Sequence, residues 1–412
     1  MLNELPPELI SNILSRLPVD SLLRFRCVSK SYCAEIDDPN FIKTHSKISM
    51  ETNSNLGVIF SDLQHDSLYS VSFDSFDRVV ELDYPLKIDV SSYDPIDIFS
   101  IHNIKIVGSC NGLLCFSNSV GRVALINPAT RKYQILPFLP LEHKSEERSE
   151  SVSWTLGFGY DPIADDYKVV RLGQFIGFSS ASFMNETMIY SLKSNSWREI
   201  SGMSYVLGTD NKMGLLLGDA LHWSVDVDRI MASPSKIVAF NLGTEKFTVV
   251  PEPELSGGEE KLCSLCILSV GRRLSICANY GIPKGFEIWV MKEYGVKESW
   301  TKLISVTPNL LSFNFKGMTT LPFSKNGDEL LMGIQGRNLV WYNLKEKTLK
   351  LMEVHDVGTP FGGQVFHGSL VPLNASLQAK TNKAGSSKGK KNRDDFLSKG
   401  FKLKLPESVL GT

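Results

Sequence analysis

The chain has 412 residues, 42% of them hydrophobic and 22% charged, a globular composition that is long enough for one large domain and a smaller one. Its formal net charge is -1, so the protein as a whole offers no strong field to attract nucleic acid or a membrane surface. No run of residues approaches the roughly 20 apolar positions that a membrane-spanning helix needs.

Residues 1–47 carry the pattern of short helices. Leu9, Ile13 and Leu17 recur every four positions and predict one apolar stripe along a first helix. Pro18 is expected to end that helix, because a proline inside a helix removes a backbone hydrogen bond.

Two more helices and a final turn are expected in the same region. Asp20 and Ser29 are good N-cap residues for a second and a third helix, and a short turn is predicted at 39–43. Three short helices bury too little surface to be stable alone, and they carry more apolar residues than so small a bundle can hide. The region is therefore expected to bind another protein.

Residues 55–373 contain a degenerate repeat that predicts β-hairpins. Each copy has an apolar run, a polar turn, an aromatic residue and a second apolar run, and the clear copies begin at Val123, Met188, Ile237, Phe286 and Leu339. A further pair of strand-like segments precedes most copies. Four strands per unit and about six units predict a mainly β fold, a β-propeller-like domain after the N-terminal helices. The segment 364–371 is expected to supply a strand that closes the ring.

Nothing in this region predicts a catalytic residue, a metal site or a cofactor. Cys263 and Cys266 form a CxxC pair without a second pair or a suitably spaced histidine, so buried thiols are expected there, as at Cys110 and Cys115. The seven histidines show no metal-ligand spacing, and a structural role is expected for His222. Five tryptophans at repeat positions are expected in the blade core: Trp197, Trp223, Trp289, Trp300 and Trp341.

Residues 375–412 form a basic and mostly polar tail. The stretch 379–393 has almost no apolar residues and is expected to be disordered. Its segment 388–393 (KGKKNR) has two interpretations, a solvated flexible tail or a nuclear-localisation patch. Hydrophobic residues return at 394–405, which predicts a segment that docks or binds a partner.

The first 45 residues resemble the F-box of plant proteins. The likeness rests on Leu5-Pro6, on residues 9–18, on the run at 22–31 and on Asp38-Pro-Asn-Phe41. It implies binding to a Skp1-like adaptor, and through the adaptor to a cullin, in an SCF-type (Skp1–cullin–F-box) ubiquitin ligase. The resemblance assigns the adaptor contacts to Leu5, Pro6, Leu9, Ile13, Leu14, Leu17, Pro18, Leu22, Leu23 and Val28.

Residues 100–355 resemble the F-box-associated, kelch-like domain of the same plant family. The motifs GSCNGL at 108–113, NPATR at 127–131 and GFGYDP at 157–162 carry this likeness. The closing residues 393–403 (RDDFLSKGFKL) narrow the resemblance to F-box proteins that restrain plant defence. That resemblance implies nucleotide-binding leucine-rich-repeat (NLR) immune receptors as substrates. The protein is expected in the cytoplasm and the nucleus.

Two functions from different classes stay open. One is a non-catalytic substrate receptor that presents a target protein for ubiquitination and degradation. The other is a free-standing propeller that binds proteins or sugars without a link to ubiquitin. An enzymatic function is a third and less favoured alternative. In either binding role the target is expected at the long connections 140–153, 173–187, 202–213 and 226–236.

Removal of residues 379–393 should leave folding intact, because this segment offers no core residues. The expected result is an unchanged melting temperature for the truncated chain. A large drop would show that the tail packs against the domain.

Overall fold

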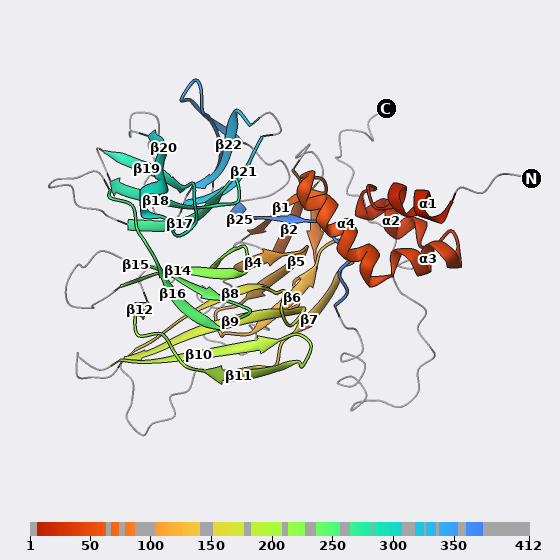
Figure 1. Ribbon diagram of the computed structural model, residues 1–412, viewed down its shortest axis with the longest axis horizontal. Helices are drawn as coiled ribbons and strands as arrows, with labels where there is room; N and C mark the ends of the chain where they lie inside the picture. Colours follow the sequence, from red (N-terminus) through yellow and green to blue (C-terminus); the bar gives the residue numbers. More distant parts are fainter. Residues whose placement is uncertain are drawn as a thin grey trace, which may run out of the picture. The chain divides into compact units, whose positions relative to one another are not determined.

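The chain divides into two compact units, residues 1–373 and 374–412. The whole predicted tail 375–412 lies outside the described residues, and Leu5 and Cys263 do too. The computed structural model describes residues 6–62, 67–73, 79–86, 104–140, 151–176, 183–207, 213–226, 236–255, 264–281, 284–306, 318–324, 327–334, 338–352 and 360–373 (Figure 1).

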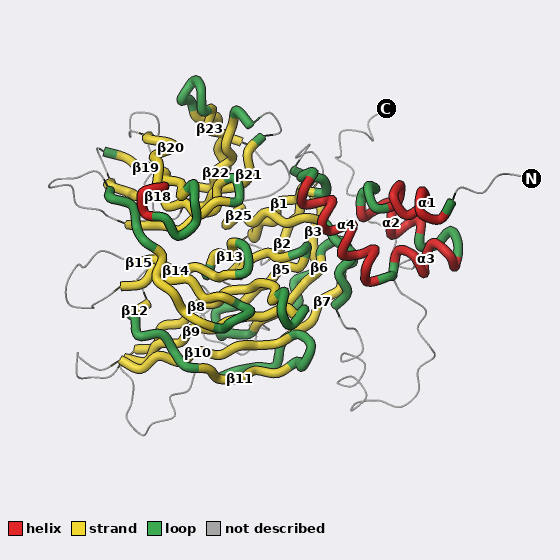
Figure 2. Tube along the Cα trace, viewed as in Figure 1, coloured by secondary structure: helices red, strands yellow, loops and turns green. Residues whose placement is uncertain are grey.

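Four helices open the chain, and strands make up most of the described residues after them (Figure 2). Ser29 caps the third helix as predicted, since its Oγ accepts the amide hydrogen of Tyr32 at 3.0 Å. The prediction of Asp20 as an N-cap is wrong. Pro18 is the N-cap of the second helix, which begins at Val19, so Asp20 lies inside the first turn. The helices are α1 (Pro7–Leu14), α2 (Val19–Phe25), α3 (Lys30–Ile36) and α4 (Pro39–Glu51).

The short turn predicted at 39–43 is wrong, because α4 continues for 13 residues to Glu51. Asp38 accepts hydrogen bonds from the amides of Asn40 and Phe41, and Pro39 suits the first helical position. Phe41, His45 and Ser49 then bury one face at intervals of four residues. This long-range packing, which the local sequence does not reveal, extends the helix.

Six sheets come after the helices, each of at least four antiparallel strands, which confirms the predicted mainly β, six-unit propeller. Blade 1 contains β25 (Pro360–His367), β1 (Leu56–Asp62), β2 (Ser67–Ser72) and β3 (Val79–Leu82). Blade 2 contains β4 (Lys105–Cys110), β5 (Leu113–Ser117), β6 (Val123–Asn127) and β7 (Lys132–Ile135). Blade 3 contains β8 (Ser151–Asp161), β9 (Asp166–Ile176), β10 (Phe183–Ser191) and β11 (Ser196–Ile200).

The other three blades have the same pattern from inner to outer strand. Blade 4 contains β12 (Val206–Leu207), β13 (Leu215–Leu217), β14 (Ala220–Asp226), β15 (Lys236–Asn241) and β16 (Lys246–Val250). Blade 5 contains β17 (Ser264–Val270), β18 (Arg273–Gly281), β19 (Gly285–Met291) and β20 (Trp300–Val306), with the short 3-10 helix η2 (Lys297–Ser299) before β20. Blade 6 contains β21 (Met318–Phe323), β22 (Glu329–Ile334), β23 (Asn338–Asn343) and β24 (Leu349–Met352).

The ring closes inside blade 1, where the last strand pairs with the first. β25 runs antiparallel to β1, with Leu56 opposite His367 and Val58 opposite Val365. The predicted closing strand is thereby confirmed, although it begins at Pro360 and ends at His367. Contacts between inner strands then pass from β25 through blades 2 to 6 and back to β25.

Alternation of strand direction gives the propeller two unlike faces. In each blade the first turn and the third turn lie on one face, called here the tight-turn face. The second turn and the link to the next blade lie on the other, the loop face. The predicted repeat marks the tight-turn face, because the polar residue of each copy starts the third turn.

Hydrogen bonds within the turns explain that polar residue. The side-chain oxygen of Asn127 accepts the amide hydrogens of Ala129 and Thr130, and Asn241 and Asn343 do the same in blades 4 and 6. Four residues later the backbone is left-handed, at Arg131 (φ 54°), Glu245 (φ 57°) and Lys347 (φ 55°). These three turns therefore close their hairpins with a residue other than glycine at the left-handed position.

The hydrophobic core lies in layers between neighbouring blades, as the pattern of two-sided burial requires. Trp223 and Trp300 are buried in these layers as predicted, and Trp197, Trp289 and Trp341 pack half-buried against them. The expected buried thiols are confirmed for Cys110, Cys115 and Cys266. Burial raises the pKa of the Cys110 thiol to about 12.

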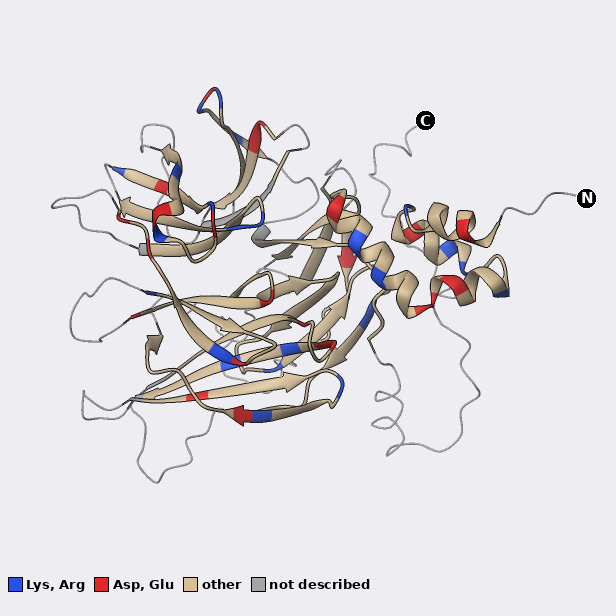
Figure 3. Ribbon diagram, in the orientation of Figure 1, with Lys and Arg blue, Asp and Glu red and all other residues tan. Residues whose placement is uncertain are grey.

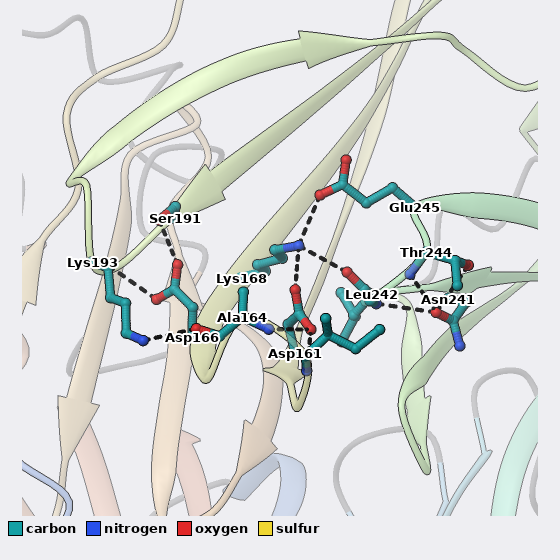
Figure 4. Close-up of polar contacts among 12 residues, drawn as sticks. Asp161, Ala164, Asp166, Lys168, Ser191, Lys193, Asn241, Leu242, Thr244 and Glu245 are labelled. Carbon is teal, nitrogen blue, oxygen red and sulfur yellow. Dashed lines mark hydrogen bonds and ion pairs between the residues drawn. The ribbon is translucent and has the colours of Figure 1, made fainter.

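A buried lysine joins blade 3 to blade 4 at the tight-turn face (Figure 4). Lys168 on β9 lies 2.6 Å from Asp161 and 2.8 Å from Glu245, and its ammonium also donates to the Leu242 carbonyl. The side chains of Lys168 and Asp161 are only 7% and 2% exposed. Burial opposes charging both groups, but their mutual contact prevails, since the pKa of Lys168 is raised and that of Asp161 lowered.

Three histidines have lowered pKa values, two of them buried (His45 and His222) and one half-buried (His367). Burial lowers the pKa of His45, His222 and His367, and the nearby Arg272 lowers that of His367 further, to about 4. His45 contacts the Leu17 carbonyl through Nε2, at 3.0 Å, and joins α4 to the segment between α1 and α2. His222 contacts the Tyr294 hydroxyl of blade 5 at 2.7 Å, which fits the structural role expected for it.

Lys168→Met should lower the free energy of unfolding by about 3–5 kcal/mol, because it leaves the Asp161 carboxylate buried without its cation. Urea unfolding at pH 7.5 measures this. Lys193→Met is the matched control, since this lysine is 59% exposed, and its loss should cost less than about 1 kcal/mol. Equal losses in the two variants would contradict the role of the buried ion pair.

Acidification from pH 7.5 to 5.5 should destabilise the chain. The folded pKa values of the three histidines lie below the unfolded value of about 6.5, so the unfolded state takes up more protons as the pH falls. Their contribution is complete above about pH 6.5 and is lost below it, on the order of 1 kcal/mol for His367. Urea midpoints of the wild type and His367→Gln test this, and a wild-type midpoint that does not change with pH would contradict it.

Candidate protein-binding surfaces

The N-terminal helices have a small core and an exposed apolar face. The core consists of Leu14, Val19, Leu22, Leu23, Ile36, Phe41 and Leu370, with Ile10, Leu17, Tyr32 and Ile42 packed against it. Large apolar side chains remain on the outside: Leu9 (51% exposed), Ile13 (53%), Phe25 (37%) and Val28 (67%). These four exposed side chains are called here the exposed helical patch.

The residues predicted to contact the adaptor divide into two sets. Pro6, Leu9, Ile13, Pro18 and Val28 are exposed, so they are available to a partner. Leu17 is half-buried, while the remaining described members, Leu14, Leu22 and Leu23, are buried in the core. In this structure those three support the exposed helical patch from beneath. The adaptor contact itself stays a prediction.

Phe25 is the member of the patch that sequence reasoning did not select. It lies at the end of α2, and its ring packs edge-on against Tyr32 with centroids 6.2 Å apart. The Arg26–Asp37 ion pair, 2.7 Å long, holds the α2–α3 connection next to it. The sequence signal that could have indicated an exposed Phe25 is its position as an aromatic residue at the end of a predicted helix, next to the charged Arg26.

The helices and the propeller share core residues on the tight-turn face. Leu370, which comes after β25, is a member of the helical core. The segment around it is fixed by side chains of blade 2: the Asn127 amide donates to the carbonyls of Ser369 and Val371 at 3.0 and 2.8 Å. Ser369 in turn donates to the Asn111 carbonyl at 2.7 Å. One asparagine thus caps its own turn and secures the junction.

Helix α4 adds polar contacts to two blades. The Lys43 ammonium lies 2.9 Å from Asp165, in the first turn of blade 3. Arg272, in the first turn of blade 5, donates to the Met50 carbonyl near the end of the helix. Both turns belong to the tight-turn face, so α4 occupies that face and leaves the loop face free of the N-terminal helices.

The connections predicted to bind a target all join strand ends on the loop face. The prediction was wrong for part of 173–187, because β9 continues to Ile176 and β10 begins at Phe183. Pairing of Gly173 with Glu186, and a 2.9 Å side-chain bond from Gln174 to Asn185, prolong these strands. Likewise 151–153 belong to β8 and 206–207 to β12. Residues 226 and 236 are the last of β14 and the first of β15, and 140, 202–205 and 213 are described outside strands. The rest of these connections lies outside the described ranges.

The described part of the chain contains no group of three or more side chains that could hold a metal ion. No helix among the described residues is long and apolar enough to cross a membrane. Basic and acidic side chains are interspersed along the described elements (Figure 3). The exposed helical patch and the loop face are the two candidate protein-binding surfaces considered below.

Two family models match the chain. Residues 2–44 match the F-box domain, and residues 59–363 match the F-box associated beta propeller domain. The domain boundaries predicted from the sequence are 1–47 for the helices, 55–373 for the propeller and 375–412 for the tail, and the two matched ranges lie within the first and the second of them.

Curated relatives match over most of their length. F-box protein CPR1 of Arabidopsis thaliana is 32% identical over 427 residues, which cover 97% of this chain and 99% of that protein. That relative is the constitutive expresser of pathogenesis-related genes, and it is the F-box protein whose C-terminus residues 393–403 of this chain resemble. A second F-box protein of the same plant is 28% identical and covers 98% of this chain and 100% of its own. An F-box/kelch-repeat protein of that plant is 30% identical, with 76% and 81% coverage.

Solved structures show only distant likeness. An oligogalacturonate lyase in complex with manganese has a TM-score of 0.38 and 12% identity, and covers 70% of this chain and 71% of its own. An α-L-arabinofuranosidase mutant from Fusarium graminearum has a TM-score of 0.37, 10% identity, and 71% and 80% coverage. Likeness at this level has no bearing on function. The family models and the curated relatives show that this chain belongs to the F-box proteins that carry an F-box-associated β-propeller domain.

Proposed function

We propose that this chain is the substrate-recognition subunit of an SCF-type ubiquitin ligase. The N-terminal helices bind a Skp1-like adaptor, which links the chain to a cullin, and the propeller holds a protein target. The chain transfers no ubiquitin itself. It raises the effective concentration of the target near a ubiquitin-loaded enzyme, as bivalent linkage does.

The exposed helical patch is the observation that carries this proposal. Leu9, Ile13 and Val28 are more than half exposed on a unit whose core is complete without them. Exposed apolar side chains cost free energy in water, and a partner that covers them recovers about 25 cal/mol per Å². The F-box family match makes a Skp1-like adaptor the expected partner.

The two faces of the propeller support the second half of the proposal. Helix α4 and the junction at Leu370 occupy the tight-turn face. The loop face is left for a target, which would be held on the side away from the adaptor-binding helices. Loops on a rigid scaffold commonly carry binding residues.

The finer proposal names the target. The resemblance of residues 393–403 to F-box proteins that restrain plant defence is the basis for NLR immune receptors as substrates and the restraint of defence as the role. We propose that this occurs in the cytoplasm and the nucleus. Co-purification from plant cells in which the proteasome is blocked should enrich such receptors, and their absence from the purified material would contradict this assignment.

Ile13→Asp should abolish binding to a Skp1-like adaptor in a pull-down with the full chain. A carboxylate there would be buried in the interface without a partner, which costs several kcal/mol, while the exposed position leaves folding unchanged. This variant is a better test than Leu14→Asp, because Leu14 is 4% exposed and a charge there would unfold the helical core.

Leu351→Asp is the matched control, because Leu351 on β24 is 52% exposed and Ile13 is 53% exposed. It should bind the adaptor like the wild type. Wild-type binding by Ile13→Asp, with both variants folded by melting temperature, would support the alternative of a free-standing propeller. The same variant should also lengthen the half-life of any co-purified target. It is preferable to deletion of residues 1–45, which would expose Leu370.

A further inference from the structure

The loop-face end of blade 2 carries an unusual set of side chains. In register, Lys105 lies opposite Ser117, and Ser117 lies opposite Val123. Leu136, after β7, completes the row, since its backbone N–H donates a hydrogen bond to the Val123 carbonyl. Neighbouring strands are about 4.8 Å apart, so this edge is about 14 Å long from the inner to the outer strand. We call it the blade 2 edge: Lys105, residues 117–123 and residues 135–140.

Charge at this edge is of one sign. Lys105 and Arg122 are its only ionisable side chains, and the described residues of the edge include no Asp or Glu. None of the ion pairs found among the described residues involves either cation. The edge therefore offers two positive charges to a partner.

Both cations lie against aromatic rings. The Lys105 ammonium is 4.9 Å from the centroid of the Trp154 ring on the inner strand of blade 3, and the Arg122 guanidinium is 5.9 Å from that of Phe138. Burial lowers the pKa of Lys105, which marks an ammonium that has lost part of its hydration. A half-desolvated cation against a ring is prepared to accept a carboxylate, because the ring keeps the cation in place without neutralising it.

Phe138 is 56% exposed, yet its backbone is fastened to blade 3. The Trp197 indole donates to the Pro137 carbonyl at 2.8 Å. Arg171 donates to the carbonyls of Leu139 and Pro140 at 2.8 and 3.3 Å. The exposed ring is thus displayed on a rigid segment, so its burial by a partner costs little ordering entropy.

The middle of the edge is equally fixed. The side-chain Oδ1 of Asn118 accepts the backbone amide hydrogen of Arg122, and the backbone N–H of Asn118 donates to the Arg122 carbonyl at 3.1 Å. Val120 at the tip of this turn is 40% exposed. An aromatic ring, an aliphatic side chain and an arginine on a rigid frame are the components of a binding hot spot.

We propose that the blade 2 edge binds an acidic segment of the substrate, in which one or more carboxylates lie next to an apolar side chain. The carboxylates pair with Arg122 and Lys105, and the apolar side chain packs on Phe138 and Val120. This inference rests on the proposed function, since it assigns a chemistry to the target of the propeller.

The probe for this site is a random 12-residue peptide library displayed on phage and selected on the immobilised full chain. Selected peptides should be enriched in Asp and Glu next to Leu, Ile, Val or Phe. A synthetic peptide of the selected sequence, measured by fluorescence anisotropy, should bind Arg122→Glu and Lys105→Glu at least about tenfold more weakly than the wild type. Phe138→Ala should weaken binding about fivefold or more.

A charge inversion makes the test specific. Selection on the Lys105→Glu/Arg122→Glu double variant should yield peptides enriched in Lys and Arg. Lys132→Glu, at the other end of blade 2, and Leu351→Ala, which is as exposed as Phe138, should leave binding of the acidic peptide unchanged. Selection without acidic enrichment, or equal losses in the edge and control variants, would overturn the inference.

Adaptor binding separates this inference from the proposed function. A chain that captures the adaptor but shows no charge dependence at the blade 2 edge retains the ligase role, and the edge loses its assignment. Charge-dependent peptide binding by a chain that does not capture the adaptor supports the edge and overturns the ligase role.

Discussion

The pairing of β25 with β1 is the contact on which the rest of the structure depends. It places the last described strand at the inner position of blade 1, beside strands from the start of the chain. Phe366 and Val365 on β25 belong to or pack against the two core layers that flank blade 1. Without this strand both layers would lose a wall, and the ring of inner strands would be open.

Ring closure also decides where the F-box sits. The residues after β25 pass under the tight-turn face, where Asn127 holds their carbonyls and Leu370 enters the helical core. The F-box of this protein therefore completes its core with a residue from the far end of the domain. Such a small helical unit needs added apolar surface to be stable, and the propeller supplies part of it. The helical unit and the propeller are consequently coupled through one set of contacts.

The two faces of the propeller differ in what they contact, because, among the described residues, α4 packs on the tight-turn face only. The tight-turn face holds α4 through the ion pair of Lys43 with Asp165 and the bond from Arg272 to the Met50 carbonyl. The loop face carries the connections that vary in length, together with the blade 2 edge, where Phe138 is exposed on a fastened segment. Under the function proposed above, this fastened segment is where a target would be held.

Sequence alone determined the elements whose causes are local. Hydrophobic periodicity, the Ser29 cap and the recurring polar turn were sufficient for three helices, strand-rich repeats and about six units, because caps and turns depend on neighbouring residues. Tertiary structure decided what depends on distant contacts. It extended α4 by burying Phe41 and His45, and it left Ile13 exposed while burying Leu14 next to it. It also brought Lys105, Arg122 and Phe138 to one edge, since strand register and blade packing join residues that no local pattern connects.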